Sequence, residues 1–144
     1  MAHSYAQAIL HVVFSTKDRQ KIISKEFQPR MWSYIAGICK ADAIFVHVIS
    51  GSDDHVHLLL QLPANWTIAE AINLIKSNSS KWAGNKFAWQ QGYAAFSVSA
   101  SQVPTVMRYI ANQDAHHRRM SFDQELIALL KKHGVEYDPK YVFG

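Results

Sequence analysis

The chain has 144 residues and one cysteine, so we expect a single domain over residues 1–144 with no internal disulfide. No apolar run is long enough to span a bilayer, and the first residues do not resemble a signal peptide, which predicts a cytoplasmic protein. The formal net charge of +4 permits a phosphate-rich partner without requiring one.

Hydrophobic spacing predicts a strand, a helix and two more strands in the first half of the chain. Residues 5–14 alternate between two faces, and Ser24 can cap an amphipathic helix of about four turns. Two β-rich runs, residues 43–49 and 55–62, are separated by the turn-forming segment SGSD. They therefore predict a hairpin.

The second half continues with a helix, a strand and two final helices. Thr67 and Glu70 match a capping box at the start of the second helix, and residues 93–99 predict a fourth strand. Pro104 suits the first turn of a third helix, and a fourth helix is expected over residues 121–133.

This order predicts an α+β fold of the split ferredoxin-like (RRM-like) type. Its antiparallel sheet would have four to five strands in the order βαββαβ, followed by two additional C-terminal helices. The first and third strands would be central neighbours in the sheet. Residues of the third strand would therefore be held rigidly by backbone pairing on both sides.

The third predicted strand contains two histidines, His55 and His57, within the segment DHVHLLL. Because successive side chains of a strand alternate, both imidazoles lie on one face of the sheet. Such a pair can be half of a metal site, or it can be two polar residues on a solvated face. The pair by itself does not decide between these interpretations.

A second pair, Tyr109 and Gln113, is four residues apart in the third predicted helix, which puts both on one helix face. Alone, this pair also fits a tyrosine at the core margin beside a surface glutamine. Together with His55 and His57 it supplies the groups for phosphodiester transfer. A divalent cation held by the histidines and the amide oxygen would bind phosphate while the phenol attacks phosphorus. Rejoining would then need no nucleotide cofactor.

Three segments resemble those of one family: HVVFSTKDR, SGSDDHVHLLLQL and FSVSASQVPTVMRYIANQDAHHRRMSFDQEL. The chain resembles the IS200/IS605-type single-tyrosine transposases with paired histidines (HUH endonucleases), which include the REP-associated tyrosine transposases. The resemblance implies that His55, His57 and Gln113 hold Mg²⁺ or Mn²⁺ and that Tyr109 is the nucleophile. It also implies a homodimer that acts on imperfect hairpins in single-stranded DNA.

Several further side chains are candidate DNA contacts, although a solvated surface explains most of them equally well. These candidates are Lys17, Arg19, Trp89, Arg108, His116, His117, Arg118 and Arg119. Asp53 and Asp54 are interpreted as turn and strand-start residues in preference to groups that orient an imidazole. His47 is expected to be structural.

Three alternatives to a mobile-element transposase stay open at this point. A domesticated relative would process chromosomal palindromic repeats by the same chemistry. A non-catalytic module would only bind single-stranded DNA hairpins, and a zinc hydrolase would use His55 and His57 with water as its nucleophile. Only the two transposase hypotheses predict a covalent bond between protein and DNA.

Overall fold

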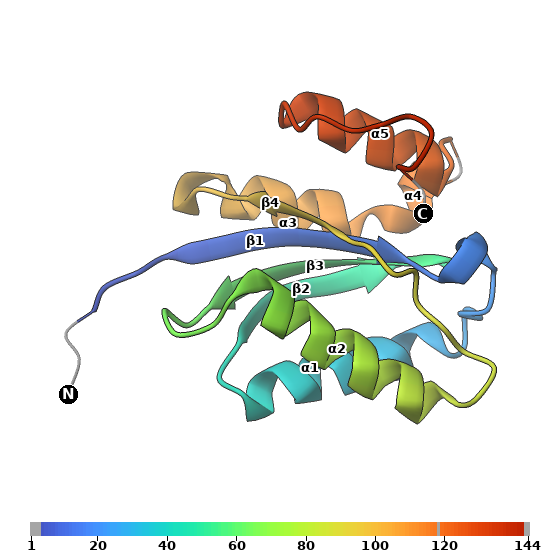
Figure 1. Cartoon of the computed structure of the whole chain (residues 1–144), viewed down its shortest axis with the longest axis horizontal. Helices are drawn as coiled ribbons and strands as arrows, with labels where there is room; N and C mark the ends of the chain where they lie inside the picture. The colour runs from blue at the N-terminus through green and yellow to red at the C-terminus, as the bar shows by residue number, and fades with distance from the viewer. Residues whose placement is uncertain (1–3, 118, 143–144) are drawn as a thin grey trace.

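The structure is a computed structural model that describes residues 4–117 and 119–142 (Figure 1). It contains a four-stranded antiparallel sheet in the order β2-β3-β1-β4. The strands are β1 (Ala8–Ser15), β2 (Phe45–Gly51), β3 (His55–Leu62) and β4 (Ala94–Ser97). The predicted α+β class is confirmed, and β1 and β3 are the central pair.

One face of the sheet carries the main apolar core, under α1 (Gln28–Ala41) and α2 (Ile68–Ala83). α2 begins as expected, because Thr67 and Glu70 form both hydrogen bonds of a capping box. α1 begins four residues later than Ser24, with Pro29 in its first turn. The Ser24 hydroxyl still accepts a hydrogen bond from the Phe27 amide, at 3.2 Å, in the turn that precedes α1.

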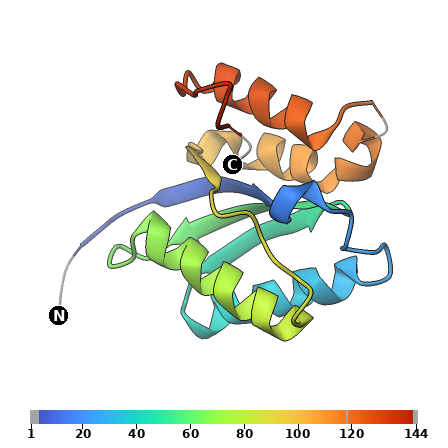
Figure 2. The same cartoon turned by 45° about the vertical axis from the view of Figure 1, so that its right-hand side comes forward.

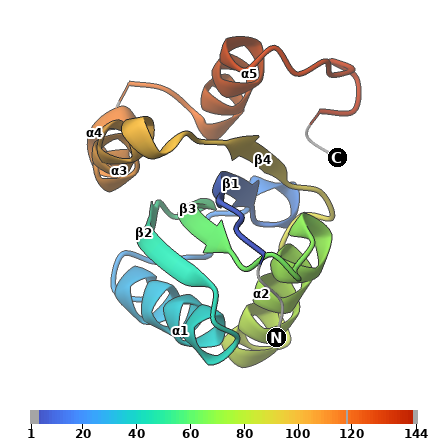
Figure 3. The same ribbon diagram turned by 90° about the vertical axis from the view of Figure 1, so that its left-hand side faces the viewer.

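The opposite face of the sheet is covered by α3 (Val103–Ala111), α4 (Gln113–His117) and α5 (Phe122–Lys132) (Figure 2). Viewed from another side, the sheet separates these helices from α1 and α2 (Figure 3). Two C-terminal helices were expected, and the described residues form three. The backbone of Asn112 leaves the helical conformation, with φ −95° and ψ 26°, so Tyr109 and Gln113 belong to different helices.

Short 3₁₀ turns, η1 (Lys17–Arg19) and η2 (Ala100–Gln102), follow β1 and β4.

Because helices cover both sides of the sheet, both faces of β1 and β3 are buried, one under α1 and α2 and the other under the C-terminal helices. Within the described residues, no helix is both long enough and apolar enough to cross a membrane.

Candidate active site

The paired histidines lie in the middle of the sheet and are fully buried. His55 and His57 pair with Ser15 and Val13 of β1, and both side chains have 0% exposure. Their rings face the C-terminal helices, with ring centroids 5.1 Å apart. The solvated-face interpretation of the pair is therefore wrong, because no water-exposed surface remains on these imidazoles.

The turn before β3 orients the His55 ring. Its Nδ1 lies 2.7 Å from Asp54 Oδ1 and 2.9 Å from the Ser52 hydroxyl. Gly51 permits this turn, since a Cβ at that position would collide with the His55 carbonyl oxygen. Our preferred interpretation of Asp54 as only a turn residue is thus wrong. A carboxylate on Nδ1 keeps the proton there and leaves Nε2 free to bind a cation.

His57 is held from the neighbouring strand by His11, a residue that sequence reasoning did not select. His11 Nε2 and His57 Nδ1 are 2.8 Å apart, and His11 is 3% exposed. Burial lowers the pKa of His57 to about 4, against the opposing effect of Glu125. Burial and the neighbouring His57 lower the pKa of His11 to about 3. Both rings are therefore neutral at pH 7, the form in which an imidazole can ligate a metal.

A buried carboxylate, Glu125 of α5, lies at the centre of the site and was also missed. Its side chain is 1% exposed, and its Oε1 accepts a hydrogen bond of 2.9 Å from His57 Nε2. Burial would raise its pKa, but hydrogen bonds from His117 and His57 outweigh burial and hold the pKa far below the usual range. The sequence contained a signal, because Glu125 interrupts an apolar stripe that includes Phe122, Leu126 and Leu129.

His117 completes the group. We predicted a phosphate contact for His117, but its Nε2 lies 3.0 Å from both Gln113 Oε1 and Glu125 Oε1. Burial would lower the pKa of His117, yet the hydrogen bond and charge of Glu125 raise it. One potential ligand atom from each of four residues lies within 4.8 Å of the other three, namely in His55, His57, His117 and Glu125.

Gln113 lies beside this cluster, as its predicted role requires. Its Oε1 is 3.0 Å from His55 Nε2, and its side chain is fully buried. Imidazole nitrogens with carboxylate and amide oxygens form a donor set that suits first-row divalent cations such as Mn²⁺. The residues present therefore fit a divalent metal centre.

Tyr109 reaches the same cluster from α3 within the same chain. Its hydroxyl donates a hydrogen bond to Glu125 Oε2, and its ring meets those of His11 and His57 edge to face, with both centroid distances 5.9 Å. Burial together with the hydrogen bond and charge of Glu125 raises the pKa of Tyr109 above its usual range. The phenol is therefore protonated at neutral pH in this arrangement.

The predicted DNA contacts fall into different environments. Lys17, Arg108 and Arg119 are exposed, whereas Arg19 forms an ion pair of 3.3 Å with Asp123. Arg118 and the side chain of His116 lie outside the described residues.

Trp89 is not available to stack on an unpaired base, so that prediction is wrong. It is 8% exposed, its indole donates a 2.9 Å hydrogen bond to the Ser79 hydroxyl, and its ring packs edge to face on Phe14 and Phe87. The turn-rich segment around it suggested a surface loop. An isolated bridge to Thr16 instead ties that segment to the end of β1.

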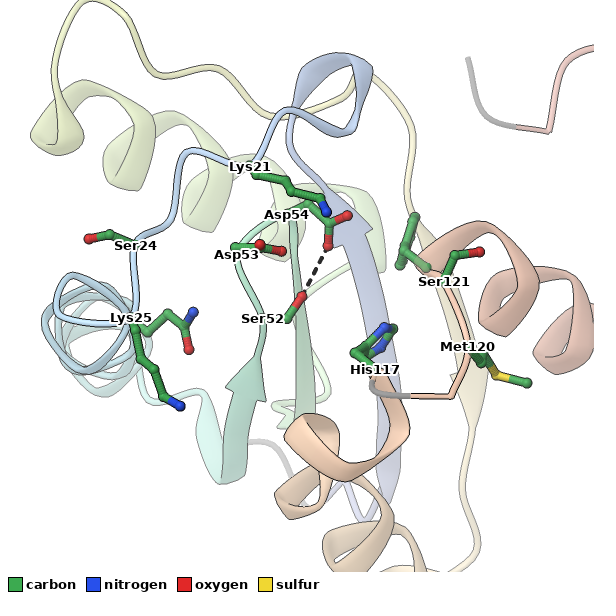
Figure 4. Close-up of a pocket in the computed structure, with 11 residues that line it drawn as sticks. Lys21, Ser24, Lys25, Ser52, Asp53, Asp54, His117, Met120 and Ser121 are labelled. Atoms are coloured by element: carbon green, nitrogen blue, oxygen red, sulfur yellow. Dashed lines mark hydrogen bonds between the residues drawn. The ribbon is translucent and has the colours of Figure 1, made fainter.

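A cavity of about 560 Å³ adjoins the cluster (Figure 4). Lys21 and Lys25 line it from the segment after β1, and Asp53 and Asp54 line it from the turn before β3. His117 is also part of its wall, so this cavity reaches the edge of the cluster from a surface that carries two lysines.

Comparison with known proteins agrees with this fold. Residues 4–113 match the family model described as "Transposase IS200 like". The chain therefore belongs to the IS200-like transposase family. The match ends at Gln113 and so includes the histidine pair and Tyr109, whereas Glu125 lies beyond it.

Two curated relatives are transposases. The transposase for insertion sequence element IS200 of Salmonella typhimurium is 22% identical over 125 residues, 78% of this chain and 81% of that protein. The ISDra2 transposase TnpA of Deinococcus radiodurans is 22% identical over 116 residues, 72% of this chain and 81% of its own length.

Two solved structures share the fold. A putative transposase from Deinococcus radiodurans superposes with a TM-score of 0.63 at 18% identity, covering 78% of this chain and 95% of the other. A REP-associated tyrosine transposase bound to a REP hairpin superposes with a TM-score of 0.64 at 15% identity, covering 81% of this chain and 73% of the other.

Proposed function

We propose that this transposase is metal-dependent and cleaves and rejoins single-stranded DNA at hairpin-marked ends through a covalent 5′-phosphotyrosine at Tyr109. The observation that carries the proposal is that the Tyr109 hydroxyl shares the Glu125 carboxylate with His57, one of the buried pair. A nucleophile of a phosphodiester reaction must lie beside the group that binds the phosphate. Here Tyr109 and the residues that would hold the phosphate-binding cation belong to one chain.

His55, His57 and Gln113 would hold the cation, with His117 and Glu125 near enough to contribute a ligand. Mg²⁺ and Mn²⁺ are the candidates, because the nitrogen ligands favour manganese and the oxygen ligands accept either ion. When bound, the cation would neutralise phosphate charge and polarise the phosphorus–oxygen bonds. No nucleotide cofactor is needed.

The chain's own residues account for the chemistry that remains. The Tyr109 oxygen forms a bond to phosphorus, and the bond from phosphorus to the DNA 3′ oxygen breaks. The phenol loses its proton, and the released 3′ oxygen gains one to become a hydroxyl. Attack by a DNA 3′ hydroxyl on the phosphotyrosine reverses these steps and rejoins the strand. The buried rings of His11 and His57 limit the access of water to the tyrosine.

Single-stranded DNA with imperfect hairpins is the proposed partner. In support, a structurally similar REP-associated tyrosine transposase is bound to a REP hairpin. Exposed Lys17, Arg108 and Arg119 supply positive charge for the DNA backbone. The homodimer implied by the family resemblance stays a prediction. Because Tyr109 and the histidines meet within one chain, dimerisation is not required to bring them together.

The test is to incubate the protein with Mn²⁺ and end-labelled single-stranded hairpin DNA and to separate the products on a denaturing gel. Wild type should form a metal-dependent covalent adduct that Tyr109→Phe does not form. Tyr141→Phe is the matched control, because that tyrosine is 71% exposed and is not one of the cluster residues.

Other results would support the alternatives. Cleavage without an adduct, undiminished in Tyr109→Phe, would indicate a hydrolase that uses water. Hairpin binding without any cleavage would indicate a non-catalytic module. A domesticated relative would form the same adduct, and the presence or absence of hairpin ends around its gene would distinguish it from a mobile element.

A further inference from the structure

The two oxygens of Glu125 contact different parts of the site. Oε1 faces the imidazoles, 2.9 Å from His57 Nε2 and 3.5 Å from His55 Nε2. Oε2 accepts hydrogen bonds from the Tyr109 hydroxyl and, at 3.3 Å, from Gln113 Nε2. One side chain therefore connects the candidate cation site with the candidate nucleophile.

Glu125 accepts a hydrogen bond from the Tyr109 hydroxyl, which also interacts with the Gln113 side chain. The Tyr109 ring borders a cavity of about 430 Å³ that His11, Val106, Leu129 and His133 also line. The rings of His11 and His57 meet it edge to face. Without the acceptor at Glu125 Oε2, the phenol would lose a hydrogen bond that holds it beside the cluster, and the adjoining cavity offers space for the ring to move.

We propose that Glu125 is a positioning residue that couples the cation site to Tyr109, with Oε1 on the cation side and Oε2 holding the phenol. This inference rests on the proposed function and makes α5, which lies outside the family match, a part of the active site. A cation held by the histidines would attract Oε1 and would thereby alter the hydrogen bond at Oε2. Cation binding and nucleophile position should therefore change together.

The first measurement needs no DNA. 3-Fluorotyrosine is placed at position 109, and its ¹⁹F NMR resonance is followed as Mg²⁺ is added. Calorimetry on each variant establishes the Mg²⁺ concentration that saturates it. Wild type should show an Mg²⁺-dependent shift that Glu125→Leu has lost, since leucine fills the space without accepting a hydrogen bond. Glu136→Gln, which removes a charge from an exposed side chain, should retain the shift.

The second measurement is the single-turnover rate of adduct formation on hairpin DNA at saturating Mg²⁺. Glu125→Leu should lower the rate at least about tenfold, the size of effect seen when groups that orient metal ligands are removed. Glu125→Gln should recover part of the loss, because its amide oxygen can still accept the phenol hydrogen bond. The Kd for the hairpin should not change in either variant.

An Mg²⁺-induced shift of wild-type size in Glu125→Leu, or equal rates in the Leu and Gln variants, would overturn the proposal. If Glu125→Leu does not fold, Glu125→Gln provides the test of the proposal. Without metal, its ¹⁹F resonance should lie at the wild-type position, and its Mg²⁺ affinity should be reduced at least about tenfold. An unchanged Mg²⁺ affinity in Glu125→Gln would overturn the proposal. If wild type forms no adduct at all, the proposed function fails, while the DNA-free measurement still tests the coupling.

Discussion

His11 and His57 share a hydrogen bond of 2.8 Å across the two central strands of the sheet. The register pairs His11 with Leu59 and His57 with Val13, so the two histidines are diagonal neighbours on one face. If His57 Nε2 binds a cation, the remaining ring proton must lie on Nδ1, where His11 Nε2 can accept it. With a cation on Nε2, His11 would thus fix both the orientation and the tautomer of this candidate ligand.

Replacing His11 with phenylalanine should weaken cation binding. The ring volume is retained but the acceptor for His57 Nδ1 is lost, so we expect Mn²⁺ affinity to fall about 10–100-fold in calorimetry. His47→Phe is the matched control, because His47 Nε2 has no hydrogen-bond partner among the described residues. Equal Mn²⁺ affinities for His11→Phe and wild type would show that this contact does not support the site.

Removing His57 should separate catalysis from DNA binding. His57→Ala deletes a proposed cation ligand and leaves the exposed basic side chains in place, so adduct formation should be lost while hairpin affinity stays within about twofold of wild type. Gel shift and denaturing gel on the same samples measure both quantities. Joint loss of hairpin binding and cleavage would instead assign His57 a structural role.

The helix caps of α2 and α5 provide a comparison between stability and activity. Ser121 and Thr67 form equivalent capping boxes, so Ser121→Ala and Thr67→Ala should each lower the free energy of unfolding by about 1 kcal/mol in urea denaturation. Because α5 carries Glu125, only Ser121→Ala should also slow adduct formation. Equal slowing by both variants would mean that α5 has no special role.

The metal-free protein should lose stability as the pH falls from 7 to 5. His11 and His57 have folded pKa values of about 3 and 4, below the 6.5 of an unfolded histidine, so the unfolded chain takes up more protons in this range. We expect the free energy of unfolding to fall by about 4 kcal/mol in urea denaturation, about 2 kcal/mol for each histidine. Stability that rises toward pH 5 would contradict these pKa directions.

His117 opposes this trend, because a raised folded pKa contributes stability below 6.5 that is lost as the pH rises through the folded value. His117→Gln should therefore steepen the loss of stability between pH 7 and pH 5. The same denaturation series, compared with wild type, measures the change in slope. A shallower pH dependence in His117→Gln would indicate that Glu125 does not favour its protonated form.

Trp89 should prove structural. Trp89→Phe removes the indole hydrogen bond to Ser79 and part of a packed ring, so the free energy of unfolding should fall by about 1–3 kcal/mol. Hairpin affinity, measured under conditions in which the variant is folded, should equal that of wild type. A large loss of hairpin affinity would restore the base-stacking interpretation.

Local patterns in the sequence account for most of the fold. Strand alternation put His55 and His57 on one face, and the capping box at Thr67 located the start of α2. These features depend on neighbours within a few residues, so periodicity and side-chain chemistry suffice. The end of α3 was not predicted, because no proline or glycine marks the break at Asn112.

Only the tertiary structure decided how the site is assembled. The hydrogen bond between His11 and His57 joins residues that are 46 positions apart in the sequence, and the hydrogen bond between His57 and Glu125 joins residues that are 68 positions apart. Such contacts depend on strand register and on where α5 packs, which local periodicity does not encode. By itself the sequence determined the two imidazoles and the tyrosine as candidates. The packing of α5 decided that one buried carboxylate joins them.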